Sequence, residues 1–153
     1  MKVLVQRVTG ARVLVEGAVV GSIGPGVVVF LGVERGDDAA VADWYAGRLA
    51  RMRLFPGAAG RPWELDLREA GREALVVSQF TLAARTRKGR RPSFDPAAPP
   101  GEALPVYRAF VEALRSRGVA VAEGRFRATM LVELVNEGPV TFLLDGPADG
   151  GRR

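Results

Sequence analysis

The chain has 153 residues, of which 48% are hydrophobic and 25% charged, so it has enough apolar material for one globular domain. It contains no cysteine and no histidine. This excludes disulfide bonds, Ser-His-Asp and Cys-His catalytic arrangements, and most transition-metal sites. An enzyme of this composition has to use carboxylates, hydroxyls, Lys and Arg, backbone dipoles, or groups of its own substrate.

The chain is basic, with a formal net charge of +5 and a sequence pI of about 10.6. Lys2 and Lys88 are the only lysines, and the other cations are arginines. A genome-wide or thermal preference for arginine would explain this without any partner. A polyanionic partner such as RNA would explain it as well, so only the clustering of the charges separates the two interpretations.

The sequence gives no sign of a membrane segment or an export signal. No stretch approaches the roughly 18 consecutive apolar residues of a membrane-spanning helix. The start, MKVLVQRVTGARVLV, alternates apolar and polar residues and lacks the apolar block and cleavage site of a signal peptide. We therefore expect a cytoplasmic protein without a membrane partner.

The first half of the chain is typical of short strands followed by a helix. Apolar patterns bounded by glycine-containing turns predict strands over 2–8, 11–15, 18–23 and 26–33. Asp37 and Asp38 offer an N-cap and a favourable charge for a helix over 38–52. Apolar residues recur in it at helical spacing, and we assign Trp44 and Tyr45 to the core.

The second half contains strands, a long loop and a second helix. Apolar runs predict strands over 73–82, 126–135 and 140–145. Residues 85–101 have no periodicity, and such a long loop in a compact domain is usually functional or disordered. Residues 102–117 predict an amphipathic helix, with Pro105 in its first turn and Gly118 at its end.

These elements predict an α+β fold. We expect a single domain over residues 1–145, with a mainly antiparallel, barrel-like β-sheet and two amphipathic helices packed on it. Residues 146–153 are expected to form a loose C-terminal tail. No internal repeat and no linker divides the chain.

The stretch VSQFTL at 77–82 is the first candidate functional segment. In a strand, Ser78, Phe80 and Leu82 would share one face, with Gln79 and Thr81 on the other. An ordinary half-buried strand accounts for these residues. The alternative is a strand end whose free N–H groups and nearby hydroxyl hold an oxyanion, and spacing alone does not decide between them.

The basic block RTRKGRR at 85–91 is the second candidate. It places five cations within seven residues: Arg85, Arg87, Lys88, Arg90 and Arg91. A solvated loop is one interpretation. The other is contact with a phosphate backbone, which gives salt-sensitive affinity without sequence readout. The neighbouring VSQFTL stretch favours an RNA that brings a reactive end with it.

The third candidate is NEGPVT at 136–141, which reads most simply as a hairpin loop between two strands. Pro139 adjoins the second strand directly, where its missing N–H would cost a ladder hydrogen bond. In the functional interpretation the Gly138-Pro139 bond is cis, which X-Pro bonds allow, and points two carbonyls in one direction.

Other catalytic patterns are absent from the sequence. No two carboxylates are placed at the about 5 to 9 Å that a two-carboxylate hydrolase needs. There is no P-loop and no GxGxxG that opens a helix, which argues against nucleotide cofactors. We expect neither a metal nor a cofactor.

Together the motifs closely resemble the D-aminoacyl-tRNA deacylases of the bacterial D-tyrosyl-tRNA deacylase type. SQFTL together with NxGPVT at this separation is highly specific for that family. The resemblance covers nearly the whole chain through QRV at 6–8, LGV at 31–33, VVSQFTL at 76–82, GRRPSF at 89–94, GRF at 124–126 and NEGPVT at 136–141. Residues 57–72 look most divergent, and no role is carried over to them.

The resemblance implies a homodimer that acts on tRNA, with both signature motifs at the subunit interface. Its reaction would be hydrolysis of the ester between a D-amino acid, or achiral glycine, and the 3′-terminal adenosine. Because L-aminoacyl substrates would be rejected, the enzyme would serve chiral proofreading in translation.

The same resemblance assigns roles to residues. Four would line the catalytic pocket, with backbone N–H groups around Gln79 and Phe80 as the oxyanion site: Ser78, Gln79, Phe80 and Thr81. Six would bind substrate or orient the groups that do: Arg7, Phe126, Met130, Asn136, Gly138 and Pro139.

Within this second set, Gly138-Pro139 would be cis and enter the partner's pocket, where its carbonyls hold the substrate amino group and exclude an L side chain. Arg7 would fix that orientation. Phe126 and Met130 would contact the terminal adenine.

Ester hydrolysis can run on positioning and an oxyanion hole, which suits a chain without His or Cys. The resemblance points to the substrate's own 2′-OH as the missing base. Thr81 has no neighbouring base to activate it as a nucleophile, so we assign it to the pocket lining. Two alternatives stay open: a non-catalytic RNA-binding or ribosome-associated domain, and a small-molecule ester or amide hydrolase.

Overall fold

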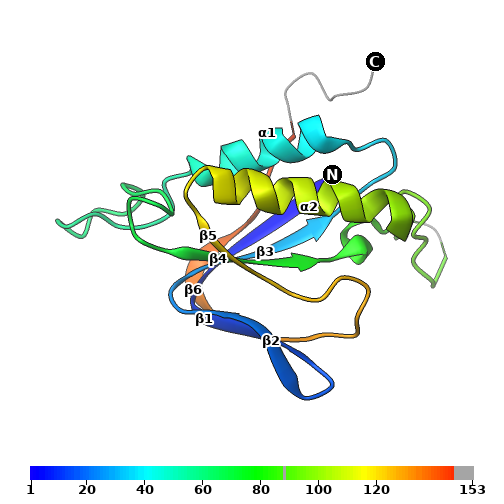
Figure 1. The fold of residues 1–153 in the computed structure, drawn as a ribbon, viewed down its shortest axis with the longest axis horizontal. Helices are drawn as coiled ribbons and strands as arrows, with labels where there is room; N and C mark the ends of the chain where they lie inside the picture. Colours follow the sequence, from blue (N-terminus) through cyan, green and yellow to red (C-terminus); the bar gives the residue numbers. More distant parts are fainter. Residues whose placement is uncertain (88, 147–153) are drawn as a thin grey trace.

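A computed structural model describes residues 1–87 and 89–146 as a curled β-sheet with both helices on one of its faces (Figure 1). The elements in chain order are β1 (Lys2–Val15), β2 (Ala18–Ile23), β3 (Gly26–Gly32), α1 (Ala39–Ala50), β4 (Glu73–Ser78), the 3₁₀-helix η1 (Phe80–Ala83), α2 (Pro100–Ser116), β5 (Ala120–Glu123) and β6 (Leu131–Leu143). The predicted α+β class with two packed helices is confirmed.

Antiparallel pairing predominates in the sheet, as predicted, but part of the sheet is parallel. The strand order is β2-β1-β3-β4-β5, and β6 pairs with β1. β1 is antiparallel to β2, β3 and β6, whereas β3-β4 and β4-β5 are parallel. Parallel neighbours need crossover connections, and the segments containing α1 and α2 supply them.

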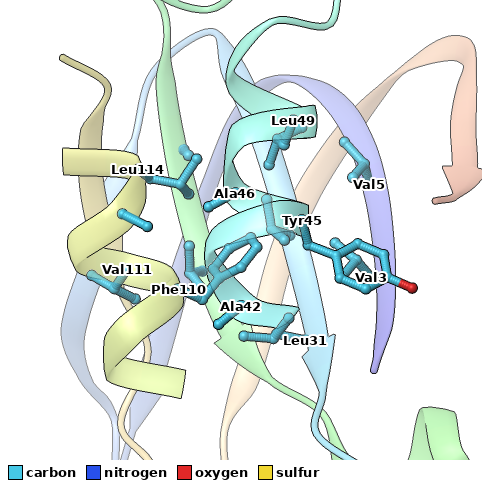
Figure 2. Close-up of a cluster of buried hydrophobic side chains, with 14 of the residues drawn as sticks. Val3, Val5, Leu31, Ala42, Tyr45, Ala46, Leu49, Phe110, Val111 and Leu114 are labelled. Atoms are coloured by element: carbon cyan, nitrogen blue, oxygen red, sulfur yellow. The ribbon is translucent and has the colours of Figure 1, made fainter. Parts of the chain in front are cut away.

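The main hydrophobic core fills the space between the sheet and the helices. Figure 2 shows the facing side chains, which come from α1 (Tyr45, Leu49), α2 (Phe110, Leu114) and the sheet (Val3, Val5, Leu31). Residues of β3 and β4 that point the other way, such as Val28 and Leu75, form a second core inside the curl of the sheet. Burial on both faces explains why these two strands are continuous apolar runs.

The sheet curls far enough to form a nearly closed barrel. Its end strands β2 and β5 approach so closely that a Cβ on Gly21 would lie 2.1 Å from the Glu123 carbonyl oxygen. Glycine at this position therefore allows the two backbones to meet.

The segments predicted as separate strands over 2–8 and 11–15 form the single strand β1. Its register against β6 shifts between Gln6 and Val8 and again between Val8 and Gly10. Val8 and Ala11 both belong to the second core, although three positions would place them on opposite faces of a regular strand. Bulges allow the strand to change faces without ending.

The start of α1 agrees with the prediction, because the Asp38 carboxylate accepts a hydrogen bond from the Val41 N–H at 2.9 Å. Tyr45 is buried as expected. Trp44 is 38% exposed, so its assignment to the core is wrong; its ring packs edge-on against Tyr45 from the outside.

Helix α2 begins at Pro100, earlier than predicted. Pro105 therefore lies inside the helix, beyond the first turn, and its predicted position in the first turn is wrong. Gly118 follows the C-cap with a φ of +81°, which is the predicted helix end.

Three further boundaries differ from the predicted ones. β4 ends at Ser78 instead of continuing to residue 82, because the chain turns into η1. Residues 120–123 form the short strand β5, which the sequence did not reveal. The segments 126–135 and 140–145 were predicted as two strands, but the one strand β6 covers residues 131–143, so the hairpin loop expected at NEGPVT is wrong.

Among the described residues, no helix is long and apolar enough to cross a membrane. Lys88 and the predicted tail, apart from Gly146, lie outside the described residues. The division into a domain over 1–145 and a tail stays a prediction.

Candidate active site

A pocket of about 590 Å³ lies where β3 and β4 end, beside the first turn of α2. Because β3 and β4 are parallel, their carboxyl ends meet at one edge of the sheet, together with η1 and the start of α2 (Figure 1). Ligands bind at such edges in open α/β sheets. The lining comes from Val33, Val77 to Phe80, Ala98, Pro100, Ala103, Phe126 to Met130, and Val132.

The SQFTL residues leave the strand at this pocket. The Gln79 N–H donates to the Leu31 carbonyl at 2.8 Å, after which the chain turns into η1. The predicted alternation of faces beyond Ser78 is therefore wrong. Ser78, Gln79 and Phe80 line the pocket. Thr81 is exposed, is not among the lining residues, and accepts a hydrogen bond from the Gln79 side-chain amide.

Two backbone N–H groups at the start of η1 are available to an oxyanion. The first N–H groups of a helix lack intrahelical partners, and no hydrogen bond between described residues uses those of Phe80 and Thr81. The Gln79 N–H is already bonded to Leu31. Of the N–H groups predicted around Gln79 and Phe80, those of Phe80 and Thr81 are therefore available, and their role as an oxyanion site stays a prediction.

Phe126 and Met130 form another wall, from the connection between β5 and β6. The Phe126 ring packs on Tyr107 of α2, with 5.8 Å between the ring centroids. The buried Tyr107 hydroxyl donates to the Val76 carbonyl at 3.2 Å. Burial, and next the negative charge of Glu123, raise the pKa of Tyr107. A neutral buried phenol therefore supports this aromatic wall.

The described lining of the pocket contains one charged residue, Arg127. Arginine stays protonated in proteins. The described lining residues include no Asp, Glu, Lys or Tyr. No side chain of the described lining therefore titrates near neutral pH, and none could act as a general base. The polar groups of this pocket are the Ser78 and Thr129 hydroxyls, the Gln79 amide, the Arg127 guanidinium and backbone donors, so a base has to come from the ligand.

Gly138 and Pro139 lie inside β6, and the peptide bond between them is cis. β6 pairs with β1 up to Asn136 and again from Thr141, so four residues of β6 stand opposite Arg7 alone. This bulge removes the conflict between a proline and a ladder hydrogen bond. Gly138 and Pro139 are exposed, and neither lines the pocket of its own chain.

Polar side chains hold this bulge, residues 137–140. Asn136 Nδ2 donates to the Arg7 carbonyl at 2.9 Å and to the Val140 carbonyl at 3.3 Å. Arg7 Nε lies 3.2 Å from Glu137 Oε2, and Arg7 Nη1 donates to the Leu54 carbonyl at 2.6 Å. Arg7 therefore ties the bulge to the segment that follows α1.

Trp63 is a neighbour of the bulge that the sequence analysis did not find. The Arg7 guanidinium lies 6.0 Å from the centroid of its ring, within cation–π range. Trp63 is 47% exposed and has a φ of +65°, which bulky residues rarely adopt. It falls in 57–72, where no role was carried over. The one feature of the sequence that could have indicated a role for Trp63 is the presence of a tryptophan in a polar, glycine-containing loop.

The described residues of the basic block lie in an exposed loop next to the pocket. Arg85 and Ser93 exchange two backbone hydrogen bonds of 2.8 and 3.0 Å, which close the loop. Just beyond, Phe94 packs edge-on against Phe80, with 5.2 Å between the ring centroids. The described cations of the block are all exposed: Arg85, Arg87, Arg90 and Arg91.

The predicted site residues thus fall into two groups. One surrounds the pocket and consists of Ser78, Gln79, Phe80, Phe126 and Met130, with Thr81 attached to it through Gln79. The other belongs to the bulge and its supports and consists of Arg7, Asn136, Gly138 and Pro139. The structure of one chain does not bring the second group into the pocket lining.

Sequence comparisons agree with the motifs. Residues 4–145 match the family model described as D-Tyr-tRNA(Tyr) deacylase. The chain is 54% identical to the D-aminoacyl-tRNA deacylase of Pelobacter propionicus over 145 residues, which cover 95% of this chain and 99% of that protein. It is also 54% identical to the D-aminoacyl-tRNA deacylase of Symbiobacterium thermophilum, with 95% of each chain covered.

Two solved structures share the fold. One is a c-Myc DNA unwinding element binding protein, with a TM-score of 0.89 and 36% identity over 97% of this chain and 100% of that one. The other is a probable eukaryotic D-amino acid tRNA deacylase, with a TM-score of 0.79 and 20% identity over 94% of this chain and 97% of that one. At the lower identity the likeness concerns the fold alone.

Proposed function

The chain belongs to the D-Tyr-tRNA(Tyr) deacylase family, and we propose that the pocket at the end of β4 is where it hydrolyses the ester between a D-amino acid and the 3′-terminal adenosine of tRNA. It is an enzyme, a hydrolase of D-aminoacyl-tRNA. The observation that carries the pocket assignment is a described lining with a serine and backbone donors but no side chain that titrates near neutral pH. Ester hydrolysis suits such a site, because positioning and oxyanion stabilisation supply much of the rate.

In the proposed reaction the ester carbonyl oxygen accepts hydrogen bonds from the N–H groups of Phe80 and Thr81. Water attacks the carbonyl carbon, and its proton passes through the 2′-OH of the terminal ribose to the leaving 3′ oxygen. The bond to that oxygen breaks, which releases the free amino acid and tRNA. The adenine packs against Phe126 and Met130, which are suited to an aromatic ligand.

Chiral selection is assigned to Gly138 and Pro139 of a second copy of the chain. Their carbonyls would hold the substrate amino group in the partner's pocket and leave no room for an L side chain. Selection by clash acts on an L side chain and does not depend on which D side chain is present. Glycine has no side chain that could clash, so it is accepted as well. The proposal is supported by the exposure of the bulge and by the polar contacts of Arg7 and Asn136 that hold it.

Strand β6 offers the surface for that second copy. In the part of the chain that the structure describes, β6 pairs with β1 alone. Large apolar side chains stand exposed along it: Leu131 at 66%, Val135 at 63% and Leu143 at 51%. A long uncovered edge strand with apolar side chains favours association. We therefore propose a homodimer in which each pocket receives the bulge of the partner.

The exposed arginines of the basic block contact the tRNA backbone in this proposal. Such contacts add salt-dependent affinity and do not read bases. The chemistry needs no metal and no cofactor, and the protein is proposed to act in the cytoplasm, where aminoacyl-tRNA is used.

Release of the amino acid from D-Tyr-tRNA and from L-Tyr-tRNA tests the function. We expect fast hydrolysis of the D-ester, while the L-ester decays at its rate without enzyme. A D-ester that stays intact would favour a non-catalytic RNA-binding domain. Equally fast hydrolysis of a D-tyrosine methyl ester would favour a small-molecule hydrolase.

A further inference from the structure

A second pocket, of about 460 Å³, begins where η1 ends. Leu82, Ala83 and Ala84 contribute to its wall, whereas Phe80, at the start of the same helix, lines the catalytic pocket. The proposed reaction uses no part of this second pocket. The rest of its lining comes from the start of β1, the loop after β3 and the basic block with the segment that follows it: Lys2, Glu34, Arg35, Arg85, Asp95 and Pro96.

The charges around the second pocket are predominantly positive. Three lining cations have no ion-pair partner among the described residues: Lys2, Arg35 and Arg85. Of the two lining carboxylates, Glu34 is paired with a cation, whereas Asp95 is bonded to a neutral hydroxyl and keeps its charge. Glu34 Oε2 accepts from the Met1 amino group at 2.9 Å, and Asp95 Oδ2 accepts from the Ser93 hydroxyl at 2.7 Å. Three cations therefore face one unpaired carboxylate in the lining, and this excess of positive charge favours an anionic ligand.

Backbone contacts hold both arginines at this pocket. The Arg35 N–H donates to the Pro96 carbonyl at 2.9 Å, and its Nε donates to the Asp95 carbonyl at 2.8 Å. This anchors the guanidinium and leaves its two terminal nitrogens for a ligand. The backbone of Arg85 is held by its two hydrogen bonds with Ser93. The guanidinium of Arg35, held through its Nε, is suited to the two adjacent oxygens of a phosphate.

We propose that the second pocket binds phosphodiester groups of the single-stranded 3′ end of the tRNA, an inference that rests on the proposed function. The 3₁₀-helix η1 has four residues. At roughly 2 Å per residue it spans about 8 Å, and a stacked strand advances about 3.4 Å per nucleotide. With the terminal adenosine in the catalytic pocket, phosphates about two or three nucleotides upstream reach the end of η1.

The second pocket and the described arginines of the basic block then form one cationic track that leads away from the catalytic pocket. Arg85 belongs to both, because it lines the second pocket and opens the block. Phosphates are the same in every tRNA, so this track holds the 3′ end irrespective of its sequence. It also gives the enzyme a way to prefer an ester on tRNA over the same ester on a free nucleoside.

The test compares two substrates with the Arg35→Ala/Arg85→Ala double variant. One substrate is D-Tyr-tRNA, and the other is the D-tyrosyl ester of adenosine, which has no phosphate. With D-Tyr-tRNA we expect kcat/KM to fall about tenfold and the slope of log KM against log salt to weaken by about 0.7 for each phosphate that the variant no longer neutralises. With the adenosine ester we expect no change.

Matched variants separate this site from general charge effects. Arg48→Ala/Arg51→Ala removes two exposed arginines at the end of α1 that do not line the pocket, and it should keep wild-type kinetics on both substrates. Arg85→Ala alone is the safeguard against misfolding, because the hydrogen bonds of Arg85 are made by its backbone. It should show a smaller loss on D-Tyr-tRNA.

The outcomes that overturn the inference are distinct from failure of the proposed function. Equal losses on both substrates would show that the two arginines support the fold or the catalytic pocket. Unchanged kinetics and an unchanged salt slope with D-Tyr-tRNA would show that no phosphate binds there. Wild-type protein that leaves both D-esters intact would refute the proposed function itself.

Discussion

The pocket at the end of β4, proposed as the catalytic one, and the bulge at 137–140 are built by different means. The pocket is enclosed by main-chain turns and by the core, since β4 ends at it, α2 begins at it and Phe126 rests on the buried Tyr107. The bulge is exposed over Glu137, Gly138 and Pro139, and polar contacts with Arg7 and Asn136 hold it. Packing therefore defines the region assigned to bond cleavage, whereas a few polar contacts define the region assigned to chiral selection.

This difference predicts that the two properties can be disturbed separately. Changes in the pocket should lower turnover of the D-ester and leave the ratio of D- to L-ester hydrolysis high. Changes at the bulge should lower that ratio while much of the D-ester turnover persists.

The largest effect is expected from the substrate. When the terminal adenosine of D-Tyr-tRNA lacks its 2′-OH, we expect turnover to fall by about 100-fold or more, the scale of general acid–base catalysis. The reason is that the described pocket lining offers no base of its own. Binding, measured by competition with D-Tyr-tRNA, should persist. Unchanged turnover would contradict catalysis assisted by the substrate.

At the bulge, Pro139→Ala should lower the ratio of kcat/KM for D-Tyr-tRNA to that for L-Tyr-tRNA by about tenfold, which corresponds to about 1.4 kcal/mol. Alanine restores an N–H and frees a φ that proline holds near −65°, so the carbonyls are directed less firmly. Pro25→Ala, at an exposed turn between β2 and β3, is the control. A loss of D-ester turnover at an unchanged ratio would place Pro139 in bond cleavage instead.

A smaller effect on the same ratio is expected from Trp63→Ala. A cation–π contact at an exposed site contributes about 0.5–1 kcal/mol, so a looser Arg7 should lower the ratio about two- to fivefold. Trp63→Phe keeps an aromatic face under Arg7 and should keep most of the ratio. If both variants behave alike, the aromatic contact does not position Arg7.

The smallest effect is expected from Thr81→Ala, which should stay within about threefold of wild-type kcat for D-Tyr-tRNA. Its hydroxyl is bonded to the Gln79 amide and has no activating base, while its backbone N–H survives the substitution. An inactive variant that is still folded and dimeric by circular dichroism and gel filtration would assign the hydroxyl as a nucleophile.

Much of the fold follows from local patterns. The two helices and the buried strands were predicted because apolar residues repeat at the spacing of one face or fill a strand continuously. The α1 start was predicted because an aspartate cap satisfies the first N–H groups wherever it occurs. Trp44 was misassigned because helical spacing shows which face a residue shares and does not show how far the core extends around the helix.

The candidate site was predicted in its parts but not in its arrangement. SQFTL and NEGPVT were found as motifs, yet η1 and the bulge in β6 were not. The 3₁₀-helix η1 was missed because the alternation of VSQFTL fits a strand as well, and the bulge was missed because glycine and proline mark turns and bulges alike. Trp63 was missed because its contact with Arg7 joins a loop to a strand more than fifty positions away, and no spacing along the chain encodes it.

Local sequence and composition were sufficient for the family, for the exclusion of histidine and cysteine chemistry, and for the presence of a helix-covered sheet. The tertiary structure decided which N–H groups of the SQFTL turn are available, that NEGPVT interrupts one strand instead of joining two, and that Arg35 and Arg85 face one pocket. The physical reason is strand register. The pairing of β1 with β6 joins residues more than a hundred positions apart, and it depends on how two faces of the sheet are buried at once, which no single segment specifies.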